Sequence, residues 1–100
     1  MSTELDELYA VIAARKINPP PNSYTAELLA KGLTEIVKKV GEEAIEVIVA
    51  ATSESEARVI YESADLVYHL LVLLAARDIE WRQVETELAR RKGLSPRLDH

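Results

Sequence analysis

LTEIVKKVGEEAIEVIVAATSESEARVIYESADLVYHLLVLLAAR, residues 33–77, is the stretch that decides the fold. Its first half repeats apolar residues on one helical face, as at Ile36, Val40 and Val47. A polar segment at residues 52–55 interrupts the pattern, and the apolar second half then resumes it. Because so short a break joins the two halves, we expect two long helices that lie antiparallel as neighbours.

The start of the second long helix is predicted at Ser53. Ser53 and Glu56 have the S-x-x-E spacing of a capping box, in which the two side chains bind backbone N–H groups of the first turn. The helices of the hairpin are therefore expected over about residues 33–52 and from Ser53 to about residue 77.

The residues before this stretch predict two further helices. An apolar face at helical spacing extends over about residues 3–16. Pro19–Pro21 end that helix, because proline lacks the backbone N–H and fixes φ. A short helix over residues 26–31 follows, with Ser23 and Thr25 as candidate caps.

Glycines mark the remaining helix ends. Gly32 ends the short helix, since glycine readily adopts the backbone conformation that follows a helix. After a break at residues 78–81, a last helix over residues 81–92 ends at Gly93, with Pro96 beyond it. The chain is therefore expected to be all-α, a bundle of four to five helices built on a central antiparallel hairpin.

The composition of the 100 residues supports this fold and excludes several classes of function. Three glycines, four prolines and 48% hydrophobic residues fit one helical domain over residues 1–100. The absence of cysteine excludes disulfides, thiolate metal sites and a cysteine nucleophile. A domain this small buries only roughly 60–65% of its unfolded surface, so we expect dimerisation to complete the bundle.

The charge and hydropathy pattern also limits the partners. A net charge of −5 provides no general basic surface for nucleic acid. The uninterrupted apolar runs are too short to span a bilayer, and no signal-peptide pattern is present. We therefore expect a cytoplasmic protein with no nucleic-acid or membrane partner.

Two acidic pairs lie on the apolar stripes of the two long helices. Glu43 and Glu46 are three residues apart, as are Glu62 and Asp65, so each pair projects from one helix face. In an antiparallel hairpin, residues at equal height have a constant sum of residue numbers. That sum is the same for Glu46 with Glu62 and for Glu43 with Asp65, which predicts that all four carboxylates meet at one level.

Four partly buried negative charges in one place require protonation or a cation. Carboxylate oxygens without sulfur ligands favour Mg²⁺ or Mn²⁺ over zinc. Either acidic pair alone would be read as a solvated helix face. A diiron site is disfavoured, because it needs Glu-x-x-His motifs and His69 lies one turn beyond Asp65. His69 is interpreted as a partner that orients Asp65 or as a core histidine.

Several motifs carry a resemblance to a known group of enzymes. The two acidic pairs, together with Glu42, resemble those of the all-helical MazG-like nucleotide pyrophosphohydrolases. Further motifs are similar to phosphoribosyl-ATP pyrophosphatases of histidine biosynthesis, and the similarity extends from about Leu5 to Arg91. These motifs are SYT at 23–25, LLAKG at 28–32, KVGEEA at 39–44 and DLVYHLL at 65–71.

The resemblance implies Mg²⁺-dependent hydrolysis of the α–β phosphoanhydride of phosphoribosyl-ATP, which yields phosphoribosyl-AMP and pyrophosphate. It also implies a homodimer or larger assembly. Four catalytic carboxylates would bind the metal: Glu43, Glu46, Glu62 and Asp65. Glu42 points about 100° away from Glu43 around the helix, so we assign it an outer catalytic role, supporting the ligands or acting as a base through water.

Seven residues are candidates for substrate binding: Tyr24, Thr25, Lys31, Lys38, Lys39, Arg90 and Arg91. Lys39 lies one turn before Glu43, where it either contacts a phosphate or pairs with that carboxylate. The other basic residues are phosphate contacts or solvated charges, and the Tyr24 segment lines a nucleotide pocket or caps a helix. Gly41 reflects either close approach of another backbone or substrate, or tight helix packing.

Two other functions remain open at this stage. A sister pyrophosphohydrolase that removes (deoxy)nucleoside triphosphates would share the metal site and differ in its substrate. A non-catalytic oligomerisation module would bind a structural divalent ion, which would raise the melting temperature without any nucleotide turnover.

Overall fold

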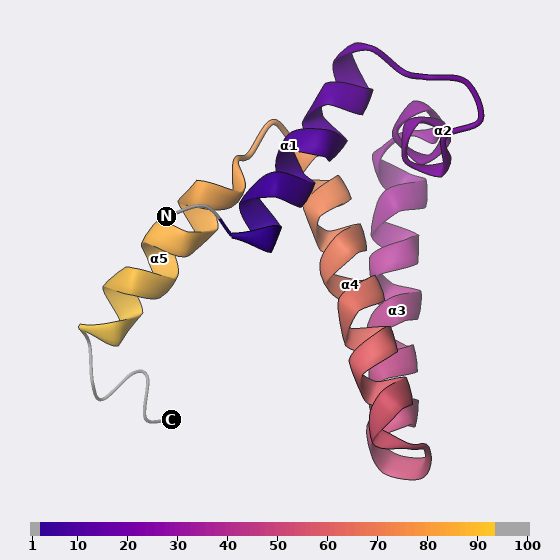
Figure 1. Cartoon of the computed structure of the whole chain (residues 1–100), viewed down its shortest axis with the longest axis vertical. Coiled ribbons are helices and arrows are strands. Elements are labelled where there is room, and N and C mark those ends of the chain that lie inside the picture. Colours follow the sequence, from indigo (N-terminus) through magenta and orange to yellow (C-terminus); the bar gives the residue numbers. More distant parts are fainter. Residues whose placement is uncertain (1–2, 94–100) are drawn as a thin grey trace.

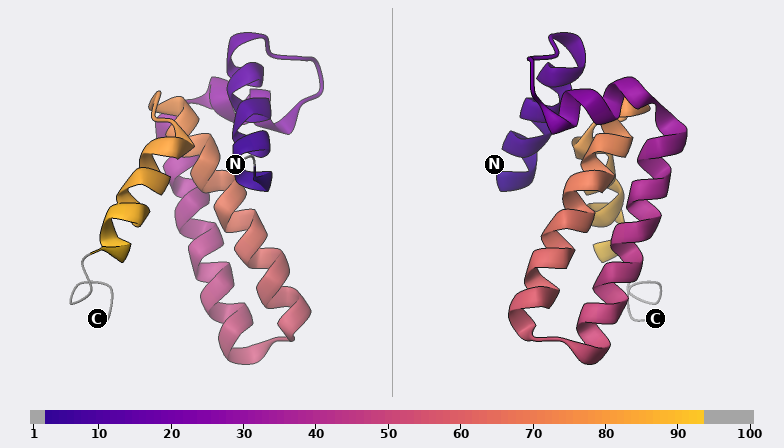
Figure 2. Two further views of the ribbon diagram at one scale, coloured as in Figure 1. Left: turned by 60° about the vertical axis from the view of Figure 1, so that its left-hand side comes forward. Right: turned by 90° about the vertical axis from the view of Figure 1, so that its right-hand side faces the viewer.

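The structure, a computed structural model, describes residues 3–93 as five α-helices, with no strand in that range. Figure 1 shows two long helices as an antiparallel hairpin, two helices around its open end and the last helix diverging to one side. The views in Figure 2 confirm that the half of the hairpin near its turn stands uncovered. In chain order the helices are α1 (Glu4–Ile17), α2 (Tyr24–Lys31), α3 (Leu33–Ser53), α4 (Glu56–Ala76) and α5 (Trp81–Lys92).

The expected all-α architecture and its central hairpin, α3 with α4, are confirmed. The last helix ends at Gly93 as predicted, whereas Pro96 lies outside the described residues. At the other junction, Gly32 ends α2 and begins α3 in a single residue, with a φ of 99°. That conformation is strained for any residue with a side chain, which explains the glycine.

Of the two candidate caps for α2, Ser23 caps the helix and Thr25 does not. The hydroxyl of Ser23 accepts a hydrogen bond from the backbone N–H of Ala26 at 3.1 Å. Thr25 is buried, and its hydroxyl is bonded to that of Tyr68 on α4.

The capping box predicted at Ser53 is wrong. Ser53 remains in α3, where its hydroxyl donates to the carbonyl oxygen of Val49 at 2.9 Å. Ser55 caps α4 instead, and its hydroxyl accepts from the backbone N–H of Arg58 at 3.3 Å. The physical reason is that α3 extends through Ser53, which leaves only Glu54 and Ser55 for the turn.

The hydrophobic core lies at the open end of the hairpin, where α1, α2 and the start of α5 cover it. Three of its side chains, Ile36, Leu71 and Val72, have no exposed surface. Near the turn, by contrast, Ile48 and Ile60 are more than 60% exposed. The buried core residues are Ile12, Leu28, Ile36, Leu71, Val72, Leu74, Ala75 and Trp81.

Helix α4 is long and apolar enough, by length and composition, to cross a membrane. This differs from the expectation, which counted uninterrupted apolar runs and therefore missed a 21-residue helix that contains an 18-residue window of mean hydropathy 1.5. The helix nevertheless contributes Leu71 and Val72 to the core and buries Glu62 and His69. These are features of the central helix of a bundle.

Replacing Ile36 by alanine is expected to lower the free energy of unfolding by about 2–5 kcal/mol, because a fully buried side chain leaves a cavity. Val37 is 44% exposed on the same helix, so Val37→Ala serves as the matched control and should cost less than about 1 kcal/mol. Urea unfolding followed by circular dichroism measures both values. Equal losses would contradict the position of the core.

Candidate functional site

The hairpin places Glu43 on α3 opposite Asp65 on α4. These two carboxylates and His69 each offer one ligand atom, and the three atoms lie within 4.8 Å of one another. Glu43 and His69 are buried and Asp65 is half-buried. The predicted register is therefore observed for this pair, because a turn at Glu54 and Ser55 brings both residues to the same height.

The two carboxylates oppose each other electrostatically. Burial raises the pKa of Glu43, and a hydrogen bond with Asp65 and the negative charge of Asp65 raise it further. His69 and Lys39 offset only part of this effect. A hard divalent cation between the carboxylates would relieve the repulsion, so the oxygen donors of this pair fit Mg²⁺ or Mn²⁺.

Lys39 supplies positive charge at the edge of the cluster. Its Nζ lies 3.5 Å from Glu43 Oε2 and 3.7 Å from Glu42 Oε1, so the predicted ion pair is present. Burial alone would lower the pKa of Lys39, but Tyr24, Glu43 and Glu42 together raise it above the usual lysine value. Lys39 therefore remains a cation beside the carboxylates at neutral pH.

Both ring nitrogens of His69 are engaged. Nδ1 lies 2.8 Å from the backbone carbonyl oxygen of Asp65 and 3.2 Å from its Oδ1. Nε2 lies 3.0 Å from the hydroxyl of Tyr24. His69 is thus a buried histidine that also contacts Asp65, which combines the two sequence interpretations.

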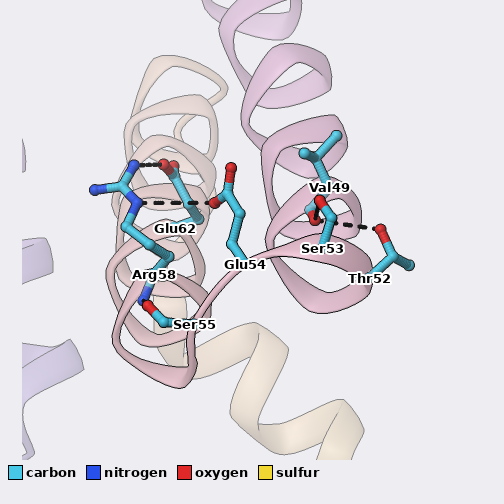
Figure 3. Close-up of polar contacts among 7 residues, drawn as sticks. All are labelled: Val49, Thr52, Ser53, Glu54, Ser55, Arg58 and Glu62. Atoms are coloured by element: carbon cyan, nitrogen blue, oxygen red, sulfur yellow. Dashed lines mark hydrogen bonds and ion pairs between the residues drawn. The ribbon is translucent and has the colours of Figure 1, made fainter.

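The other two predicted metal ligands lie outside this cluster. Glu62 is buried, but its carboxylate is paired with Arg58 one turn earlier on α4, and Arg58 Nε lies 3.8 Å from Glu54 Oε1 (Figure 3). Glu46 is exposed on α3. Among the described residues, the ligand atoms that come together are those of Glu43, Asp65 and His69, whereas Glu62 is held by Arg58. Metal ligation by Glu46 and Glu62 stays a prediction. Sequence reasoning missed Arg58, although its i, i+4 spacing from Glu62 was a usable signal.

A cavity of about 180 Å³ lies beside the cluster, between α2 and α3. Tyr24 and Lys39 line the cavity and also contact the cluster, since the hydroxyl of Tyr24 contacts His69 and the ammonium of Lys39 contacts Glu43. Two lysines with apolar and aromatic neighbours suit a phosphorylated ring compound, although two glutamates also line the wall. The lining residues are Tyr24, Glu27, Leu28, Lys31, Glu35 and Lys39.

Sequence comparisons relate the chain to known proteins. The profile described as phosphoribosyl-ATP pyrophosphohydrolase matches residues 5–92, which include every candidate site residue. The chain belongs to the phosphoribosyl-ATP pyrophosphohydrolase family.

Relatives from distant organisms carry the same enzyme name, phosphoribosyl-ATP pyrophosphatase. The Trichlorobacter lovleyi protein is 58% identical over 91 residues, which cover 91% of this chain and 84% of that protein. The Limosilactobacillus fermentum protein is 52% identical, covering 91% and 86%. The Methanocella arvoryzae protein is 46% identical, covering 92% and 99%. The family resemblance inferred from the motifs is therefore confirmed.

Four further residues that the sequence predicted for catalysis or substrate binding lie outside the cluster. Glu42 is half-exposed beside Glu43, and Lys38 is exposed on α3. Arg90 and Arg91 lie on α5, which packs against α1, and both pair with Glu87, whose pKa they lower to about 2. The described chain does not bring these arginines to the carboxylates, and their contact with phosphate stays a prediction.

Gly41 stands next to Glu42 on an open face of α3. A Cβ added at Gly41 would meet no heavy atom of the described chain within 4 Å. Tight packing against another helix of the same chain is therefore the wrong explanation for this glycine. The alternative explanation, close approach of a second chain or of substrate, stays a prediction.

In this pyrophosphohydrolase family member, Glu43→Gln is expected to stabilise the metal-free chain at neutral pH, because it removes a buried charge that faces Asp65. A raised pKa means that the folded chain binds more protons than the unfolded chain. Its stability therefore falls as pH rises from the ordinary value of 4.5 through the folded pKa.

The gain should be about 0.5–2 kcal/mol at pH 8 and should shrink toward pH 4.5. Thermal unfolding in EDTA at both pH values measures it. Glu42→Gln is the control, since that neighbouring side chain is half-exposed and faces no second carboxylate in the cluster. A gain of the same size in both variants would contradict the assigned repulsion.

Proposed function

We propose that this chain, as one domain over residues 1–100, hydrolyses the α–β phosphoanhydride of phosphoribosyl-ATP in the second step of histidine biosynthesis. The products are phosphoribosyl-AMP and pyrophosphate. The observation that carries the proposal is the facing pair of buried Glu43 and half-buried Asp65 beside a lysine-lined cavity, in a chain whose relatives bear this enzyme name.

We propose Mg²⁺, with Mn²⁺ as a substitute, as the cofactor. Glu43 and Asp65 are the central ligands. Glu46 lies one turn further along α3, and Glu62 joins the set when its carboxylate leaves Arg58. When bound, the cation supplies the positive charge that allows an acidic site to accept a polyphosphate.

The side chains at the cavity account for substrate binding and for the proton released. Lys39 and Lys31 contact phosphate oxygens, and Tyr24 and Leu28 pack against the rest of the nucleotide. Hydrolysis adds one water, whose oxygen bonds to phosphorus as the bridging P–O bond breaks. The proton of that water passes to a carboxylate, for which the half-exposed Glu42 is suited through solvent.

The deciding experiment measures pyrophosphate released by the purified chain with Mg²⁺, given phosphoribosyl-ATP or a panel of deoxynucleoside triphosphates. We expect a preference for phosphoribosyl-ATP that EDTA abolishes. Glu46→Gln and Glu62→Gln should each lower turnover by orders of magnitude with unchanged helical content by circular dichroism. Glu56→Gln, at an exposed position at the start of α4, is the control and should retain activity.

The other outcomes of this experiment identify the competing functions. A preference for a deoxynucleoside triphosphate would move the chain to nucleotide-pool housekeeping with the same metal site. Pyrophosphate from no substrate, combined with a melting temperature raised by metal, would identify a non-catalytic oligomerisation module. Near-normal turnover in either glutamine variant would exclude the four-carboxylate site.

We also propose that the chain forms a homodimer through the uncovered half of the hairpin. The radius of gyration over Cα atoms is 15.1 Å, whereas a compact chain of this length has about 13 Å. The uncovered half carries a patch of exposed apolar side chains. A second copy can cover this patch with its own identical patch, as two-fold symmetry requires. The exposed apolar side chains of this patch are Ile45, Ile48, Val49, Ile60 and Tyr61.

Ile48→Glu is expected to convert the dimer into a monomer, because it places a charge in the middle of the apolar patch. Light scattering after size exclusion should give twice the chain mass of 11.2 kDa for the wild type and 11.2 kDa for the variant. Val11→Glu, at an exposed apolar position on α1, is the control and should stay dimeric. A monomeric wild type would rule out the proposed assembly.

We further propose a cytoplasmic location and a soluble nucleotide as the partner, without nucleic acid or membrane. The net charge of −5 supports the absence of a nucleic-acid partner, since it provides no general attraction to a polyanion. The buried Glu62 and His69 on α4 support the absence of a membrane partner, because ionisable groups suit a helix in a folded bundle better than one in lipid.

A further inference from the structure

Tyr24 connects the cavity to the carboxylate cluster. Its side chain lines the cavity on α2, and its hydroxyl lies 3.0 Å from Nε2 of His69 on α4. The two rings are nearly perpendicular, with centroids 5.9 Å apart. This hydrogen bond is made across 45 positions of sequence, so the docking of α2 determines it.

The hydrogen bonds of His69 fix which nitrogen carries the proton. Nδ1 lies 2.8 Å from the backbone carbonyl oxygen of Asp65, and a carbonyl only accepts, so Nδ1 carries the hydrogen. In the neutral ring, Nε2 then holds a lone pair that accepts from the hydroxyl of Tyr24. That lone pair is the group through which a neutral imidazole binds a metal.

A second contact holds Tyr24 in this position. The next residue, Thr25, is 4% exposed and bonds through its hydroxyl to Tyr68, the residue before His69. The rings of Tyr68 and His69 are also perpendicular, with centroids 4.9 Å apart. Two consecutive residues of α2 thus contact two consecutive residues of α4, which prevents the phenol from moving away independently.

We propose that Tyr24 is a positioning residue that determines metal selectivity, because it occupies Nε2 of His69 and thereby keeps the neighbouring site an oxygen-only site. A ligand atom of the His69 ring lies within 4.8 Å of ligand oxygens of Glu43 and Asp65, and Nδ1 is the nitrogen beside Asp65, 3.2 Å from its Oδ1. Nε2 joins the two carboxylates when the ring turns, which its hydrogen bond with Tyr24 opposes. An imidazole ligand favours Co²⁺, Ni²⁺ and Zn²⁺, whereas carboxylates alone suit Mg²⁺ and Mn²⁺. This inference rests on the metal site of the proposed function.

The test measures metal binding by the full chain without nucleotide, which excludes any effect of Tyr24 on the substrate. Relative to the wild type, Tyr24→Phe is expected to bind Co²⁺ at least about tenfold more tightly, with a stronger visible absorption from nitrogen ligation. Its affinity for Mn²⁺ should change less than about threefold, because carboxylates dominate binding of that ion. Circular dichroism confirms that each variant is folded.

Two further variants keep the test specific. Adding His69→Gln to Tyr24→Phe should return both the Co²⁺ affinity and the spectrum to wild-type values, since the free imidazole is gone. Tyr61→Phe removes an exposed phenol from α4 and should change neither quantity. A gain in Co²⁺ affinity that survives in the double variant would overturn the inference.

The remaining outcomes separate this inference from the proposed function. Unchanged Co²⁺ affinity and spectrum in Tyr24→Phe would overturn the inference, and a rise in KM alone would then assign Tyr24 to the substrate. Metal binding that is undiminished in Glu43→Gln would also overturn it. Pyrophosphate release by the wild type decides the proposed function separately, because a chain that binds metal and cleaves no nucleotide still reports on Tyr24.

Discussion

Two negative charges facing each other across the seam of a helical hairpin are the constraint on which the rest of this structure depends. Glu43 and Asp65 meet where apolar side chains would pack more favourably, and burial and mutual repulsion raise the pKa of Glu43. The helices stay together because Ile36, Leu71 and Val72 are fully buried at the open end of the hairpin. The packing energy of the core therefore offsets the free-energy cost of placing these two carboxylates together in the metal-free chain.

The acidic residues Glu43, Glu62 and Asp65 each contact a different partner within the chain. Lys39 lies beside Glu43, and Arg58 is paired with Glu62. Asp65 contacts His69, whose other nitrogen meets the hydroxyl of Tyr24. Each carboxylate thus has a neighbour that limits its repulsion. In the proposed metal site, a divalent cation that recruits Glu62 would draw its carboxylate away from Arg58 and so would link metal binding to a rearrangement near the turn.

The same hairpin has two unlike halves. Helices α1 and α2 cover the open end, whereas the half near the turn exposes apolar side chains such as Ile48 and Ile60. Glu46 lies on the exposed part of α3, and Gly41 leaves open space on that helix. Proposed dimerisation would cover these positions, so assembly and completion of the metal site would depend on one surface.

Local sequence patterns determined the five helices, the antiparallel hairpin and the facing of Glu43 and Asp65, because helical periodicity and a short turn leave one register. The cap at Ser55 escaped prediction, since neighbouring serines offer equivalent caps and the extension of α3 selects between them. The pairing of Glu62 with Arg58 is local to α4 and is compatible with their i, i+4 spacing, whereas only the tertiary structure decided that Tyr24 meets His69. The first contact depends on a side-chain rotamer, and the second on how α2 packs against α4 across 45 positions of sequence, where no local pattern acts.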